Sequence, residues 1–102
     1  MAKITQKRWF HATTKQGLKS ILKEGILWGI DDDKRHTFLA RNYDELIRMI
    51  SLPYFTDLRK CEVVLSVRYI PNGLDDDYNP KWWEMIVTKP IPISNVQVYK
   101  YL

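Results

Sequence analysis

A strand pattern that leads directly into an amphipathic helix pattern occurs twice in this chain, and this duplication constrains the fold more than any other feature. The two passages correspond position by position at an offset of 28 residues. The matched apolar pairs are Phe10 and Phe38, Ala12 and Ala40, Leu18 and Leu46, Ile21 and Met49, and Leu22 and Ile50. We therefore predict two strand–helix units, at about residues 7–28 and 35–56, that form an internal pseudo-repeat with a groove between them.

Capping signals locate the two predicted helices. Thr13–Gln16 and Asn42–Glu45 have the spacing of a capping box, in which a side-chain oxygen accepts hydrogen bonds from backbone N–H groups at a helix start. Gly25 suits the left-handed backbone conformation that follows a helix end. We expect the first helix over about residues 15–24, with the second ending near Pro53 because proline interrupts a helix.

The rest of the chain, residues 60–102, has a strand-rich pattern. Apolar and polar residues alternate over residues 61–70, and residues 82–88 and 96–102 have the composition of further strands. We therefore predict an α+β fold in a single domain, residues 1–102. Two strand–helix units are followed by antiparallel strands, and both helices pack on a small mixed sheet.

Composition limits the classes of protein to which the chain can belong. The formal net charge is +4, which favours phosphate-bearing or acidic partners but is mild for a dedicated nucleic-acid-binding protein. Cys61 is the only cysteine, so no disulfide forms within the chain; with no signal peptide recognised, we expect an intracellular location. No apolar run approaches the roughly 20 residues that cross a bilayer, and we expect no membrane partner.

His11 and Thr13 are candidates for a binding or catalytic site. They stand two residues apart in the first predicted strand, so both side chains point to one face and could form the floor of a pocket. The alternative is a structural role, in which the histidine is hydrogen-bonded at a strand edge.

Glu84 is the third candidate, and it lies in an aromatic-flanked predicted strand. An ionised carboxylate in such a strand costs free energy unless it is paired or exposed. It could stabilise a developing positive charge or act as a base, or it could simply face outward beside a lysine. No metal site is predicted, because histidine and cysteine are too few for zinc and the two aspartate triplets lack the spacing of a calcium loop.

Aromatic and basic residues near the predicted units suit a ligand groove. The groove could accept a peptide, a protein segment or a nucleotide-bearing ligand, and needs no cofactor. The predicted groove residues are Trp9, His11, Phe38, Arg41, Trp82 and Trp83. Basic pairs such as Lys7-Arg8 could hold a phosphate-bearing chain, or they could be solvated strand ends.

The chain resembles the ADP-ribosyltransferase and RNA 2′-phosphotransferase superfamily over most of its length. The resemblance is carried, in chain order, by Trp9–Thr13, Leu18–Ile26, Arg35–Ala40, Trp83–Val87 and Ile91–Pro92. It implies an enzyme that uses NAD, in which His11 and Thr13 contact the ribose and Glu84 stabilises the oxocarbenium-like transition state. In general character, although no motif carries the likeness, the chain also resembles small orphan proteins of viruses that infect hyperthermophilic archaea. This resemblance implies that the protein is located in the host cytoplasm.

The chain departs from the superfamily at several positions. Phe38 stands on the second strand where the diphtheria-toxin type of transferase places a tyrosine, and Arg48 and Met49 stand where another tyrosine is expected. Arg8, Arg41 and Arg48 are only loose counterparts of the arginines of the phosphotransferases. Binding of a protein, peptide or nucleotide-bearing ligand is therefore our first expectation. ADP-ribosyl transfer is the alternative, and nucleic-acid binding is the third.

Overall fold

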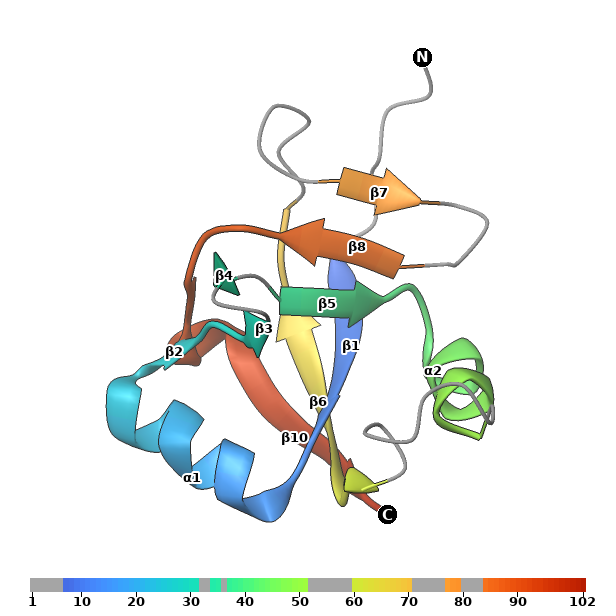
Figure 1. Ribbon diagram of the computed structural model, residues 1–102, viewed down its shortest axis with the longest axis horizontal. Coiled ribbons are helices and arrows are strands. Elements are labelled where there is room, and N and C mark those ends of the chain that lie inside the picture. The colour runs from blue at the N-terminus through green and yellow to red at the C-terminus, as the bar shows by residue number, and fades with distance from the viewer. Residues whose placement is uncertain (1–6, 32–33, 36, 52–59, 71–76, 80–83) are drawn as a thin grey trace.

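The computed structural model describes residues 7–31, 34–35, 37–51, 60–70, 77–79 and 84–102 (Figure 1). Its helices are α1 (Lys15–Glu24), α2 (Tyr43–Ile50) and the short 3-10 helix η2 (Ile93–Asn95). Its strands are β1 (Arg8–Thr13), β2 (Ile26–Leu27), β3 (Ile30–Asp31), β4 (Lys34–Arg35), β5 (Thr37–Ala40), β6 (Val63–Arg68), β7 (Asp77–Asn79), β8 (Glu84–Val87), β9 (Ile91–Pro92) and β10 (Val96–Tyr101).

The main sheet has six strands in the order β10-β6-β1-β5-β8-β7, and every described pairing within it is antiparallel. The strands β2 and β9 form a separate two-stranded sheet, as do β3 and β4. The predicted α+β class is confirmed. The prediction of a mixed sheet is wrong for the described strands, because every strand of the main sheet runs antiparallel to the strands beside it.

The six-stranded sheet consists of two halves that meet at a single residue pair. All six residues of β1 pair with β6, whereas β1 and β5 are paired only at Phe10 and Ala40. In Figure 1, β5, β8 and β7 run horizontally, whereas β10, β6 and β1 run upright or obliquely across that direction. The bridge between Phe10 and Ala40 is therefore the point at which the two halves separate.

The two helices cover opposite faces of the sheet. One core cluster contains Trp9 and Leu39 and includes Ile21 of α1. The other contains Phe10 and Ala40, whose side chains alternate with the first pair along β1 and β5, and it includes Leu46 of α2. The groove that the pseudo-repeat predicted therefore cannot lie between the helices, because the sheet separates them.

Local signals place the helix ends, with one correction. The predicted bounds of α1 are confirmed, and Gly25 follows it at a φ of 76°, in the left-handed region that favours glycine. The N-cap, however, is Thr14 and not Thr13: the Thr14 hydroxyl accepts a hydrogen bond from the Gly17 amide at 2.9 Å. Asn42 caps α2 as predicted, accepting from the amide of Glu45 at 2.9 Å.

The buried face of α1 is narrower than the sequence pattern predicted. Ile21 is buried and Leu18 packs against the same core cluster, but Leu22 is 60% exposed. Leu22, the next residue after Ile21, therefore does not contact the sheet and faces solvent for the most part. In β6, Val63, Leu65 and Val67 share one buried face, as the alternation predicted.

Thr13 explains why the first turn of α1 contains a glycine. A β-carbon added to Gly17 would overlap Thr13 Oγ1, so glycine lets the end of β1 approach the helix closely. We expect Gly17→Ala to destabilise the protein by about 1 kcal/mol or more, because the overlap exceeds the gain in helix propensity. In a Thr13→Ala background the same substitution should stabilise by up to about 1 kcal/mol.

A double-mutant cycle of urea unfolding measures this coupling. The pair serves as its own control, since the helix propensity gained at residue 17 is the same in both backgrounds. An equal effect of Gly17→Ala with and without the threonine side chain would contradict the close approach.

Candidate functional site

The imidazole of His11 lies where β1 and β5 separate. His11 Nδ1 is 2.8 Å from the carbonyl oxygen of Phe38, which belongs to β5. A carbonyl oxygen only accepts hydrogen bonds, so Nδ1 carries the hydrogen and donates it. This bond links the two strands just beyond the Phe10–Ala40 bridge, where the main-chain ladder ends. The His11 side chain thus continues the hydrogen bonding between β1 and β5 where main-chain pairing ends.

This environment keeps His11 neutral at pH 7. Burial lowers the pKa of the imidazole below its usual value of about 6.5, and this effect outweighs the hydrogen bond to Phe38, which raises it. With the hydrogen fixed on Nδ1, Nε2 is an acceptor. The half-buried ring therefore offers a hydrogen-bond acceptor rather than a positive charge.

Thr13 ends the same strand, and its place differs from that of His11. Its backbone pairs with Val63, and its carbonyl oxygen accepts a hydrogen bond from the amide of Glu62 at 3.0 Å. Its half-buried hydroxyl lies against the first turn of α1, beside Gly17. The alternation along β1 places His11 and Thr13 on the face that α1 covers.

The sheet register brings the backbone of Glu84 close to that of His11. Glu84 is the first residue of β8 and is paired with Ala40, which is in turn paired with Phe10. Two strand spacings separate Glu84 from Phe10, or about 10 Å, and Phe10 precedes His11 in the chain. The side chain of Glu84 and the whole of Trp82 and Trp83 lie outside the described part of the structure.

The remaining predicted groove residues have different surroundings. Trp9 is fully buried, and its indole N–H donates to the Tyr69 carbonyl at 3.2 Å, so it belongs to the core and offers no surface to a ligand. Phe38 is 39% exposed. Arg41 forms an ion pair with Glu45, 2.6 Å between Nη2 and Oε1. Of the predicted groove residues that the structure describes, it brings His11 and Phe38 together, through the imidazole and the Phe38 carbonyl, while the Phe38 side chain lies on the face of Ala40, opposite to His11.

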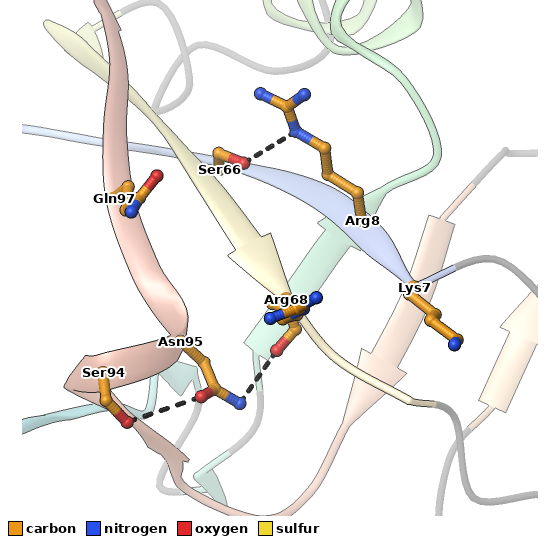
Figure 2. A pocket seen from close by; sticks show the side chains of 7 residues that line it. All are labelled: Lys7, Arg8, Ser66, Arg68, Ser94, Asn95 and Gln97. Carbon is orange, nitrogen blue, oxygen red and sulfur yellow. Dashed lines mark hydrogen bonds between the residues drawn. The ribbon is translucent and has the colours of Figure 1, made fainter.

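A basic pocket, which the sequence did not predict as a unit, lies on the other face of β1. It has a volume of about 460 Å³ and is lined by Lys7, Arg8, Ser66, Arg68, Ser94, Asn95 and Gln97 (Figure 2). The residues come from the start of β1, from β6, from η2 and from β10. Lys7-Arg8 was visible as a basic pair, but its proximity to Arg68 depends on strand pairing, which the sequence does not specify.

Comparison of the chain with protein-family models, with curated proteins and with solved structures gave no match in any of the three. In the described part of the chain, no helix is long and apolar enough to span a membrane. The same residues contain no group of three or more histidine, cysteine, aspartate or glutamate side chains that could hold a metal ion.

The lowered pKa of His11 predicts how stability depends on pH. The folded pKa lies below the unfolded value of about 6.5, so the unfolded chain binds more protons below that pH. The contribution of His11 is therefore complete above about pH 6.5, and it is lost as the pH falls from there toward the folded pKa. The slope for this one group cannot exceed about 1.4 kcal/mol per pH unit.

Denaturant unfolding between pH 5 and 8 measures this dependence in the natural chain and in His11→Gln. Glutamine keeps an N–H donor for the Phe38 carbonyl but does not ionise. The variant should lose the part of the slope that begins near pH 6.5. Identical slopes in the two proteins would contradict a buried, neutral His11.

Proposed function

We propose that this domain binds a nucleotide-bearing ligand at the junction of β1 and β5. The observation that carries the proposal is the hydrogen bond from His11 Nδ1 to the Phe38 carbonyl. It fixes a neutral imidazole where the two halves of the main sheet separate. A polar group that is held by the fold and has a remaining acceptor is suited to orient a ligand.

The chemistry of the junction favours a nucleoside over a simple anion. A neutral Nε2 accepts a hydrogen bond from a hydroxyl group, such as those of ribose, and gives no electrostatic attraction to a phosphate. Phe38 holds the imidazole through its main-chain carbonyl; its 39% exposed side chain alternates with that of Leu39 along β5, so it lies on the face of Ala40 and not beside the ring. A peptide or protein segment is the other ligand class for this site, and it would use main-chain hydrogen bonds.

Of the predicted pseudo-repeat, this proposal keeps the site between the two units but places it between their strands. The two strand–helix units contact each other through their strands, at the Phe10–Ala40 bridge, and their helices cover opposite faces. We propose that the ligand site lies at this contact between the strands, where each unit contributes one side. His11 comes from the first unit and Phe38 from the second.

ADP-ribosyl transfer from NAD is the second candidate. The sheet register brings its residues near one another at the backbone, with Glu84 in the row of Phe10 and Ala40. His11 lies in the next row, on the other face. Glu84, Ala40 and Phe10 form one row across three strands, so residues far apart in the sequence come within about 10 Å at the backbone. In this reaction the bond between nicotinamide and the ribose breaks, nicotinamide leaves with the bonding electrons, and an acceptor nucleophile bonds to the ribose. A carboxylate at residue 84 would stabilise the positive charge that develops on the ribose.

Titration with ADP-ribose, AMP and NAD, followed by ¹⁵N NMR, tests the binding proposal. We expect shift changes centred on His11 and Phe38. His11→Phe should weaken binding about tenfold or more, because it removes both the acceptor for the ligand and the donor to the Phe38 carbonyl while an aromatic ring is kept. Lys19→Ala, on the exposed face of α1, is the control. Equal affinity in His11→Phe and in the natural chain, or binding of peptides alone, would reject the proposal.

Incubation with NAD labelled in the adenylate part tests the enzymatic candidate separately. We expect label to become attached to an acceptor and nicotinamide to be released in equal amount. Glu84→Gln should lower the rate by at least about a hundredfold, since loss of one group that stabilises transition-state charge costs on that scale. Release of nicotinamide at the same rate from Glu84→Gln would exclude a role for the carboxylate, and NAD binding without turnover would leave the domain a binding module.

A further inference from the structure

We propose that the basic pocket holds phosphate groups of a single-stranded nucleic acid. The pocket is the one lined by Lys7, Arg8, Ser66, Arg68, Ser94, Asn95 and Gln97. It lies on the face of β1 that carries Phe10, whereas His11 lies on the face covered by α1. The inference is therefore independent of the ligand proposed for the junction of β1 and β5.

The positive charge of the pocket is built into the strand pairing. Arg8 and Arg68 are directly opposite each other on β1 and β6, and Lys7 adds a third cation beside them. Two positively charged side chains at directly opposed strand positions concentrate positive charge at one place on the sheet. The described lining contains no carboxylate, and its other four residues carry hydroxyl and amide groups that can donate to phosphate oxygens.

Hydrogen bonds between the lining residues fix the walls of the pocket. Arg8 Nε donates to Ser66 Oγ at 2.9 Å, which orients the guanidinium along β6 (Figure 2). Asn95 Nδ2 donates to the Arg68 carbonyl at 3.0 Å, so η2 is tied to the end of β6. A site whose side chains are already held loses less conformational entropy when it binds its ligand.

Aromatic side chains continue from the pocket along β10. The register of β10 shifts between Val98 and Lys100, and this irregularity brings both Tyr99 and Lys100 onto the face that carries Phe10. Tyr99 is 45% exposed, and its ring lies 5.3 Å from Arg8 Cζ and 5.0 Å from the Phe10 ring. Lys100 Nζ lies 5.5 Å from the Tyr43 ring.

Cations that alternate with an exposed aromatic ring match a polymer of phosphates and bases better than a single anion. Single-strand-binding surfaces combine a positively charged track for the backbone with aromatic rings on which bases stack. The pocket supplies three cations, Tyr99 supplies a partly exposed ring beside them, and Lys100 extends the positive charge past that ring. A net charge of +4 supports the same class of partner.

Binding of fluorescein-labelled twelve-residue oligo(dT), measured by anisotropy over a range of salt concentrations, tests the inference. The test variant is Lys7→Gln with Arg68→Gln. The control is Lys19→Gln with Lys23→Gln, which removes the same two charges from exposed positions on α1. We expect the pocket variant to weaken binding about tenfold at low salt and to reduce the salt slope by about 1.4, the value for two phosphate contacts with a single strand. The control should change both quantities far less.

A second pair of variants separates stacking from charge. Tyr99→Leu should weaken oligo(dT) binding about tenfold without changing the salt slope, and Tyr99→Phe should bind as the natural chain does. Thermal unfolding of each variant shows whether it is folded.

Three results would overturn the inference. Equal losses in the pocket and α1 variants would mean that only net charge matters. If inorganic phosphate displaced oligo(dT) completely at a concentration that saturates a single anion site, the pocket would be a site for one anion and not for a nucleic-acid strand. Binding to vesicles containing phosphatidylserine, with none to oligo(dT), would mean a membrane surface.

Discussion

The structure depends on how main-chain groups find hydrogen-bond partners where β1 and β5 diverge in the main sheet. A buried carbonyl group needs a hydrogen-bond donor, and in a continuous antiparallel sheet the neighbouring strand supplies it. Beyond the Phe10–Ala40 bridge, the donor for the Phe38 carbonyl is the imidazole of His11. Thr37, which precedes Phe38, accepts a hydrogen bond from the amide of Gly29 at 3.0 Å through its side chain. Side chains thus complete the hydrogen bonding at the separation, which fixes an ionisable ring between the two halves of the sheet.

The features that the sequence predicted well are those set by neighbouring residues. The bounds of α1, the left-handed Gly25 and the cap at Asn42 all follow from spacings of a few positions, and all three are confirmed. The N-cap was misplaced by one residue because Thr13 and Thr14 are both good caps. Thr14 is used because Thr13 still belongs to β1.

The features that the sequence could not predict depend on strand order. Nothing in the local pattern states that Glu84 and Phe10 lie in one row, or that Arg8 opposes Arg68. The same limit explains Trp9, since a tryptophan in a strand can face a groove or the core, and the structure places it fully in the core. The basic pocket was missed for the same reason.

The two candidate surfaces use opposite faces of one strand. Residues of β1 alternate between them, so that His11 lies on the α1 side, while Arg8 and Phe10 face the basic pocket and the aromatic side chains of β10. The junction offers a neutral acceptor, whereas the pocket offers positive charge beside an aromatic ring. This division of chemistry means that a nucleoside and a phosphate backbone would be bound at separate places, each of which can be removed without the other.

The tautomer of His11 tests the account most directly, because every argument about the junction rests on which ring nitrogen carries the hydrogen. Long-range ¹H–¹⁵N correlation spectra of the imidazole at pH 7 distinguish the two nitrogens. The account predicts a neutral ring protonated at Nδ1, with Nε2 unprotonated. A neutral ring protonated at Nε2 would contradict it, since Nδ1 would then have no hydrogen to donate to the Phe38 carbonyl.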